Sequence, residues 1–191
     1  MFKRIFRYFF LFALFKNAIA SSQDINKKDY FDEIIMSQDS FKVMPSQNNL
    51  RELHTATTLV ISCVDFRLRD ETTKLFDDIF KMQDDYDEVA LPGASLSYVV
   101  DEFPEWNTTV SNIITILKKL HSIKRIVFLD HYECGAYKMV KGKQHTYNRE
   151  DDLKMHQEVM IQASNKLKKE FPDLKVYGLM MDLNGHVDKV F

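Results

Sequence analysis

The sequence predicts an α/β protein built on a mainly parallel sheet of four to five strands flanked by helices, with an N-terminal helical arm. Short β-branched and apolar runs alternate with longer segments of helical periodicity from about residue 57 onward. Such alternation is typical of strand–helix–strand crossover units, whose strands lie parallel and are buried on both faces. Apolar residues form 45% of the 191-residue chain and charged residues 28%, as in a globular domain with a substantial core.

The first 20 residues differ in composition from the rest of the chain. They contain Lys3, Arg4 and Arg7, then an apolar run at residues 8–15, and then Ala-Ile-Ala before Ser21. A basic start, a short apolar run and a small-x-small site are the parts of a secretory signal peptide. The apolar run is too short to span a bilayer, which needs about 20 residues. We therefore expect export to the periplasm or the outside of the cell; the alternative is an uncleaved amphipathic helix that keeps the protein at a membrane.

Residues 21–56 are predicted to form the helical arm, and residues 57–191 the main domain. The arm is polar with scattered apolar residues, and YFDEIIMSQ (30–38) has helical spacing. The domain begins with TTLVISCV (57–64), which is β-branched and almost wholly apolar, as a buried strand is. RDETTKLFDDIFKM (69–82) follows with the periodicity of a helix.

The later elements continue this alternation. One helical segment spaces its apolar residues along a single face, and the next has acidic residues early and lysines late, as the helix macrodipole favours. In order, the predicted elements are strand 86–93, helix 108–122, strand 124–130, helix 149–171 and, within 174–191, a fourth strand that turns at Asn184-Gly185 into a short return strand.

The two cysteines of the chain follow two of the predicted strands. Cys63 closes the strand at 57–64, and Cys134 comes shortly after the strand at 124–130, three residues beyond His131. Since the carboxyl ends of parallel strands meet at one edge of a sheet, these side chains should converge. Two thiolates and an imidazole suit zinc and the softer metals, and three protein ligands leave the fourth position open, as in catalytic zinc sites.

A disulfide between Cys63 and Cys134 is the alternative, because cysteines of exported proteins often pair. A metal is the better interpretation, since a disulfide would leave His131 without a role. Asp65 and Arg67 should lie on the same side of an extended segment as Cys63, where carboxylate and guanidinium could pair. Asp65 would then accept a hydrogen bond from a metal-bound water, or would itself become the fourth ligand.

The segments CVDFR (63–67) and HYECG (131–135) resemble the C-x-D-x-R and H-x-x-C-G motifs of the β-class carbonic anhydrases. The resemblance extends from about Thr57 to the C-terminus and includes the order of strands and helices. It implies reversible hydration of carbon dioxide to bicarbonate with Zn²⁺ as cofactor. The residue roles that it implies are zinc ligation by Cys63, His131 and Cys134 and a catalytic pair of Asp65 and Arg67.

The resemblance also bears on partners. It implies a homodimer or higher homo-oligomer, with N-terminal helices wrapped around the partner. Nucleic acid is not an expected partner, because the net charge is −2 and no basic stripe lies outside the extreme N-terminus.

The sequence departs from the family pattern around the substrate position. ALPGAS (90–95) stands where many members have Arg-Asn-x-(Ala/Gly)-Asn, so we expect the backbone of Gly93, together with Gly135, to contact substrate. Asp130 stands where glycine commonly precedes the histidine. The chain is thus a divergent branch, for which carbonyl sulfide or carbon disulfide is an alternative substrate. A catalytically silent zinc-binding domain, capped by Asp65, is a further alternative. The remaining histidines, His156 among them, are interpreted as structural or exposed.

Overall fold

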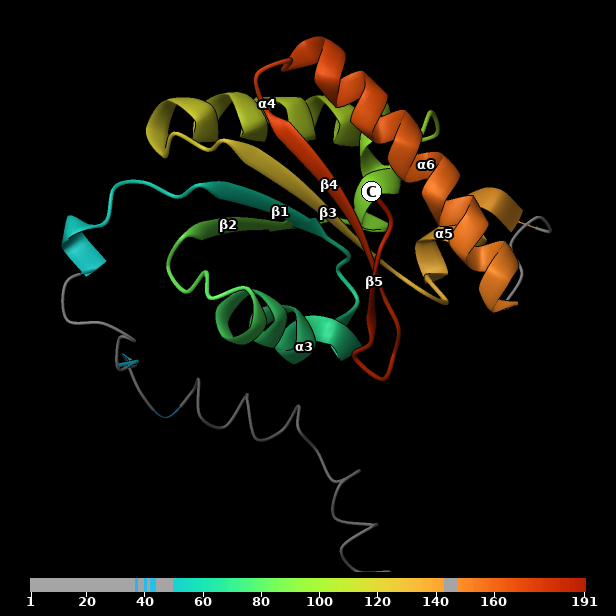
Figure 1. Ribbon diagram of the computed structural model, residues 1–191, viewed down its shortest axis with the longest axis horizontal. Coiled ribbons are helices and arrows are strands. Elements are labelled where there is room, and N and C mark those ends of the chain that lie inside the picture. Colours follow the sequence, from blue (N-terminus) through green and yellow to red (C-terminus); the bar gives the residue numbers. More distant parts are fainter. Residues whose placement is uncertain (1–36, 38–39, 41, 44–49, 143–147) are drawn as a thin grey trace, which may run out of the picture. The chain divides into compact units, whose positions relative to one another are not determined.

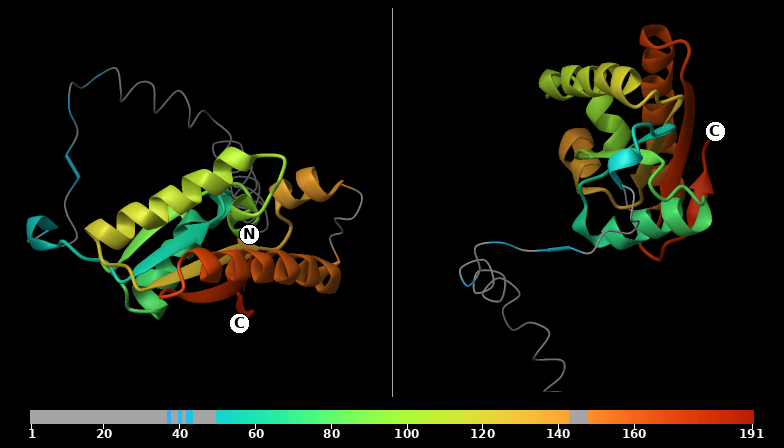
Figure 2. Two further views of the ribbon diagram at one scale, coloured as in Figure 1. Left: turned by 90° about the horizontal axis from the view of Figure 1, so that it is seen from above. Right: turned by 90° about the vertical axis from the view of Figure 1, so that its left-hand side faces the viewer.

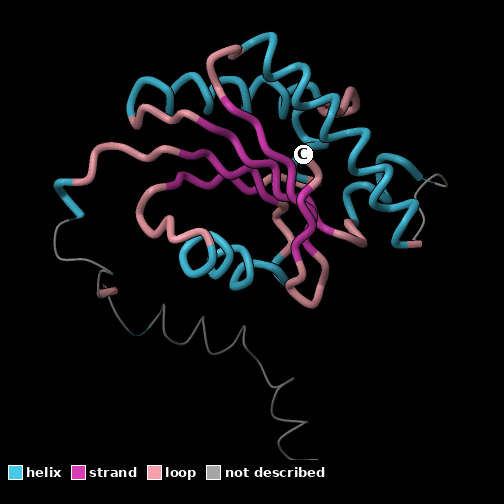
Figure 3. Tube along the Cα trace, viewed as in Figure 1, coloured by secondary structure: helices cyan, strands magenta, loops and turns pink. Residues whose placement is uncertain are grey.

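Five strands form one sheet in the order β2-β1-β3-β4-β5 (Figure 1). The first four strands along the chain pair in parallel, and β5 returns antiparallel to β4. Figure 3 shows the strands side by side in magenta. This arrangement confirms the predicted mainly parallel sheet and its return strand. The strands are β1 (Thr58–Ser62), β2 (Tyr86–Ala90), β3 (Arg125–His131), β4 (Lys175–Met181) and β5 (Val187–Lys189).

The computed structural model describes residues 37, 40, 42–43, 50–142 and 148–191. The predicted signal peptide and most of the predicted arm lie outside the described residues, so both stay predictions. Residues 49–191 cluster as one unit, which includes the predicted domain. Among the described residues, no helix is both long enough and apolar enough to cross a membrane.

Helices cover both faces of the sheet. α4 (Pro104–Leu120) and α6 (Arg149–Glu170) lie on one side, and α3 (Arg69–Lys74) lies on the other and continues as the π-helix η3 (Leu75–Ile79) (Figures 1 and 2). Two apolar clusters result, one beneath α4 and α6 and one beneath α3 and η3. The sheet is therefore the middle layer of three, as its almost wholly apolar strands predict.

Side chains of β3 alternate between these two clusters. Phe128 packs into the cluster with α4 and α6, whereas Leu129 packs into the cluster on the α3 side. The same alternation separates the next two residues. Asp130 points toward α6, where it meets His156, and its neighbour His131 points to the opposite face. Two polar side chains at the end of one strand thus face two different environments.

Two of the short elements that were not predicted follow strands of the sheet. The 3-10 helix η4 (Ala94–Tyr98) follows β2, and α5 (Gly135–Lys141) follows β3. The helix predicted at 108–122 begins earlier, at Pro104. Proline suits the first turn of a helix, because the N–H that it lacks would have no partner inside the helix. Both η4 and α5 are too short to display a hydrophobic period, and both border the candidate site.

Candidate metal centre

The three predicted ligands converge at the carboxyl ends of β1 and β3. Cys63 directly follows β1, His131 is the last residue of β3, and Cys134 immediately precedes α5. One ligand atom from each residue lies within 4.8 Å of the other two. β1 and β3 are parallel neighbours, with Ser62 opposite Leu129, so their ends reach the same edge together. Among the described residues, this Cys-His-Cys cluster could hold a metal ion.

The distance between the two sulfur atoms separates a metal site from a disulfide. The Sγ atoms of Cys63 and Cys134 lie 3.8 Å apart, and both cysteines are free. A disulfide bond is about 2.05 Å long. Two thiolates bound tetrahedrally to zinc at about 2.3 Å each would lie about 3.8 Å apart. The observed spacing therefore fits two ligands of one ion.

The imidazole of His131 presents one nitrogen for a ligand. Its Nδ1 lies 2.8 Å from the carbonyl oxygen of Tyr132, to which it donates. Its Nε2 is buried and has no hydrogen-bond partner. A buried acceptor without a partner costs free energy, and a metal ion at this atom would remove that cost. A backbone bond at the other ring nitrogen is also how proteins usually orient a metal-binding histidine.

The two thiols differ in protonation. A hydrogen bond from the Cys134 thiol lowers the pKa of Cys63 to about 4, although burial opposes the shift. The same contact and burial raise the pKa of Cys134. The N–H of Gly93 also donates to Cys63 Sγ at 3.4 Å. One thiolate is thus already present at neutral pH, and a cation between the sulfurs would favour the second.

Gly93 reaches this sulfur because its backbone is left-handed, with φ of +78°. A side chain there would be strained, and its Cβ would lie 3.0 Å from Leu96. The observed contact of Gly93 is to a predicted metal ligand. Its role in substrate binding stays a prediction.

Arg67 holds the carboxylate of Asp65 through a bidentate pair. The Nε–Oδ1 distance is 2.9 Å and the Nη2–Oδ2 distance is 2.6 Å. The backbone N–H of Arg67 also donates to Oδ1. Together these hydrogen bonds lower the pKa of Asp65 to about 2, against the opposing effect of burial. Asp65 is therefore an ionised acceptor at neutral pH.

The predicted pair thus forms, but not in an extended segment as the sequence analysis assumed. Asp65 caps the 3-10 helix η2 (Phe66–Leu68), so the chain turns directly after it. This turn brings the backbone N–H of Arg67, as well as its side chain, onto the carboxylate.

An open, mainly apolar hollow of about 470 Å³ adjoins the cluster. Phe103 and Trp106 stack there with ring centroids 4.3 Å apart and form one wall. Such a surface suits a small uncharged molecule better than a charged one. Gly135 lines the hollow, as its predicted role requires. The lining residues are Cys63, Val64, Asp65, Pro92, Phe103, Trp106, Cys134, Gly135, Ala136 and Met139.

A buried polar network beside the cluster was not predicted. The carboxylate of Asp130 accepts hydrogen bonds from the N–H and hydroxyl of Ser95, the hydroxyl of Tyr137 and Nδ1 of His156. Each of these four residues is at most 1% exposed. Its hydrogen bonds and the nearby carboxylate charges raise the pKa of His156, although burial is the largest single influence and lowers it. The only feature of the sequence that pointed to this network was Asp130, which stands where glycine is usual in the family.

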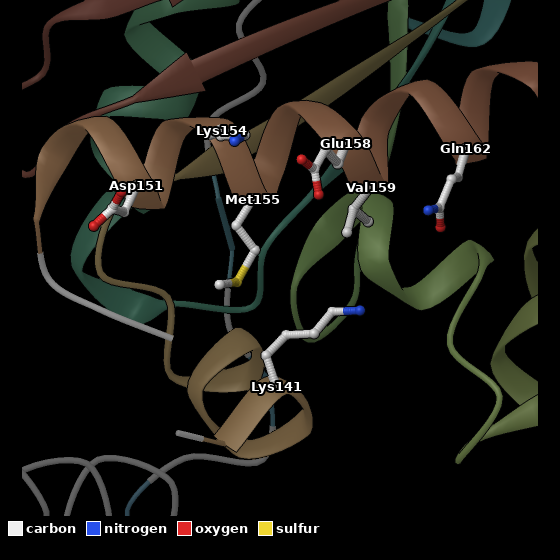
Figure 4. Close-up of a pocket in the computed structure, with 7 residues that line it drawn as sticks. All are labelled: Lys141, Asp151, Lys154, Met155, Glu158, Val159 and Gln162. Atoms are coloured by element: carbon white, nitrogen blue, oxygen red, sulfur yellow. The ribbon is translucent and has the colours of Figure 1, made fainter. Parts of the chain in front are cut away.

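A second hollow lies between α5 and α6 and contains none of the predicted site residues (Figure 4). Its charged side chains carry both signs and line an open groove, and they do not converge on one point as the ligands of a metal would. We assign it no function. Its lining residues are Lys141, Asp151, Lys154, Met155, Glu158, Val159 and Gln162.

The fold and the Cys-His-Cys cluster define a protein of the β-carbonic-anhydrase-like class. The family described as putative carbonic anhydrase matches residues 53–191, and the chain belongs to this family. This membership confirms the resemblance drawn from the two motifs.

The relatives in sequence are themselves described only as uncharacterized proteins. One, from Rickettsia conorii, is 43% identical over 159 residues, which cover 83% of this chain and 85% of the relative. Another, from Rickettsia bellii, is 44% identical over 150 residues, which cover 78% of this chain and 91% of the relative.

Solved structures with the same fold include two carbonic anhydrases. A β-carbonic anhydrase of Aspergillus fumigatus matches with a TM-score of 0.53 and 14% identity, over 94% of this chain and 89% of that chain. A carbonic anhydrase from Glaciozyma antarctica matches with a TM-score of 0.52 and 12% identity, over 88% of this chain and 98% of that chain. At these identities, the likeness shows the fold.

Proposed function

We propose that this protein is a zinc-dependent carbonic anhydrase that hydrates carbon dioxide reversibly to bicarbonate. The observation that carries the proposal is the position of the ligand cluster. Three ligand atoms within 4.8 Å of one another lie at the edge of an apolar hollow, beside an ionised carboxylate. Such a site can hold an ion through three protein ligands and leave its fourth position facing the hollow.

In this proposal, Cys63 Sγ, His131 Nε2 and Cys134 Sγ hold the zinc ion. A bound zinc ion supplies a water whose pKa is lowered to about 7. Asp65 accepts a hydrogen bond from the attacking water and so orients its lone pair toward substrate. Arg67 keeps this carboxylate ionised and fixed in direction through its two side-chain hydrogen bonds.

The hollow would bind the substrate and keep other water away. Phe103 and Trp106 give a flat apolar wall to a linear, uncharged molecule. The backbone of Gly135 lines this hollow, and that of Gly93 bonds to Cys63 Sγ, so we propose that both contact an oxygen of the product. Carbonyl sulfide has the same linear shape and lack of charge, and the hollow supports it as a second substrate candidate.

The position of Asp65 bears on the alternative of a silent domain. A capped site would need Asp65 among the ligands, but both of its oxygens bond to Arg67. This pairing supports an open fourth position. We also propose a homodimer or higher homo-oligomer, which light scattering coupled to size-exclusion chromatography would test. Export through residues 1–20 remains our prediction.

The test of the proposal measures zinc and activity on the same preparation. We expect close to one zinc per subunit in the purified protein, and carbon dioxide hydration in a stopped-flow assay. Cys134→Ser should lose both zinc and activity. His121→Ala is the matched control, because His121 pairs with Asp87 outside the ligand cluster and should change neither quantity. Zinc without hydration of carbon dioxide, but with hydrolysis of carbonyl sulfide, would support the second substrate instead. A protein without zinc would contradict the proposal.

A further inference from the structure

The residue just before His131 is tied to three elements at once. Asp130 accepts from the N–H and hydroxyl of Ser95 in η4 at 3.0 and 2.7 Å. It also accepts from the hydroxyl of Tyr137 in α5 at 2.7 Å. Nδ1 of His156 in α6 completes the set at 2.8 Å. One of the four donors bonds to Oδ1 and three bond to Oδ2, so the end of β3 is fixed from the face opposite His131.

His156 connects Asp130 to a second buried carboxylate. Its Nε2 lies 3.5 Å from Oδ1 of Asp152, one turn earlier on α6, which is within ion-pair distance but is not a hydrogen bond. The ring also stacks on Tyr137, with centroids 3.6 Å apart. Since His156 is fully buried, it has no route for passing protons to bulk water. A role in holding geometry suits this position better than a role in proton transfer.

Asp152 acts on the other end of the ligand segment. Its Oδ2 accepts the backbone N–H of Glu133 at 2.8 Å, directly before Cys134. Glu133 has φ of +60°, an uncommon conformation for a residue other than glycine. An external hydrogen bond is what such a turn needs to persist. This turn sets the direction in which the chain continues to Cys134.

We propose that His156 is a positioning residue for the metal centre, linking Asp130 and Asp152 so that the segment carrying His131 and Cys134 is fixed at both ends. This inference rests on the proposed zinc site. Carboxylates only accept hydrogen bonds, so an imidazole with a hydrogen on each nitrogen suits this place: Nδ1 donates to Asp130, and Nε2 makes a charge contact with Asp152. Without His156, Asp130 would lose a hydrogen-bond donor and Asp152 would lose the ring nitrogen that faces it, so neither carboxylate would be held as firmly against the ligand segment.

Two conservative variants separate the two arms of this link. In His156→Asn the side-chain amide can occupy the place of Nδ1 and keep the bond to Asp130. In His156→Gln the amide reaches the place of Nε2 and can keep only the contact to Asp152. Met160→Ala is the matched control, because Met160 is buried in the same helix one turn later but packs in the apolar cluster beneath α4 and α6. It should lower stability without disturbing the link.

The readouts are the rate of zinc transfer to a coloured chelator and the absorption spectrum of the cobalt-substituted protein. We expect both His156 variants to release zinc about 10-fold faster than wild type or more, the usual range for residues that orient ligands. His156→Gln should be faster than His156→Asn, because Nδ1 makes a hydrogen bond to Asp130 whereas Nε2 makes only an ion-pair contact with Asp152. The thiolate-to-cobalt bands should shift in both variants. Met160→Ala should keep the wild-type spectrum and release rate.

The outcomes distinguish this inference from the proposed function. Wild-type release rates and spectra in both His156 variants, with zinc bound, would overturn the inference alone. Equal acceleration in Met160→Ala would also overturn it, since a general loss of stability would then suffice. A wild-type protein that binds no zinc would overturn the proposed function and this inference together. If neither variant folds, Tyr137→Phe decides: it removes one bond to Asp130, and an unchanged release rate would overturn the inference.

Discussion

Oδ2 of Asp65 lies 3.7 Å from Nε2 of His131, and the same oxygen accepts a hydrogen bond from Arg67 at 2.6 Å. The carboxylate is therefore beside the ligand cluster but bound to the guanidinium. This position distinguishes between two possible roles of Asp65, orienting a reacting water and serving as a metal ligand. A group held beside the open position can orient a reacting water, whereas a group inside the cluster would close the site.

Asp65→Asn tests that separation. The amide keeps the shape of the side chain but is no longer a charged acceptor, so it should orient the attacking water poorly. We expect zinc content to stay at the wild-type level while kcat falls by about 10²-fold. Stopped-flow hydration and metal analysis on the same sample measure both. Asp173→Asn is the control, because Asp173 also pairs with a cation, Lys118, but outside the site. A loss of zinc in Asp65→Asn would instead identify Asp65 as a ligand.

The low pKa of Cys63 predicts the alkylation behaviour of the metal-free protein. A thiol whose pKa is about 4 is almost fully thiolate throughout pH 6 to 9. Its reaction with iodoacetamide should therefore hardly change over that range, whereas an ordinary thiol, with a pKa near 8.5, slows about tenfold per unit below its pKa. Cys134→Ala removes the hydrogen bond that lowers this pKa most, so pH dependence should return. Mass spectrometry would locate the label, and a steep profile in wild type would contradict the prediction.

The strands and the three ligands could be predicted because their signals are local. Each strand is a short apolar run, and Cys63 and His131 come directly at strand ends. The parallel arrangement then brings those ends together without any further information. The spacing of Asp65 and Arg67 predicted that they could pair, and the family resemblance added the catalytic role of that pair. The predicted extended conformation of this segment was wrong. The chain turns at η2 because Asp65 caps that helix, a contact that an extended segment would lack.

The network around Asp130 could not be predicted for a physical reason. Its donors come from three elements far apart in sequence: Ser95 in η4, Tyr137 in α5 and His156 in α6. Two of these elements are too short to show periodicity, so neither their existence nor their orientation was accessible. A buried aspartate must have partners, but the sequence alone does not say which residues they are.

Trp106 offers a direct optical test of the ion's position. It is the single tryptophan of the chain and lines the same hollow as Cys63 and Cys134. Cobalt bound by the two thiolates absorbs where tryptophan emits, so cobalt should quench the fluorescence strongly, and zinc much less. Titration of the metal-free protein would show one equivalent per subunit. Quenching that persists in Cys63→Ser would mean that the ion binds elsewhere.

Asp130→Ala should be among the most destabilising single substitutions in the domain. It deprives three buried donor side chains of their acceptor, and it leaves the imidazole of His156 between Tyr137 and a single carboxylate. Breaking one side of a buried charged pair costs about 3 to 5 kcal/mol. Urea unfolding of the metal-free protein measures this loss without a contribution from zinc. Asp173→Ala, which breaks a surface pair with Lys118, should cost far less, because exposed ion pairs are screened by water. Equal losses in the two variants would show that the buried network does not stabilise the fold, and that the position of His131 depends on β3 alone.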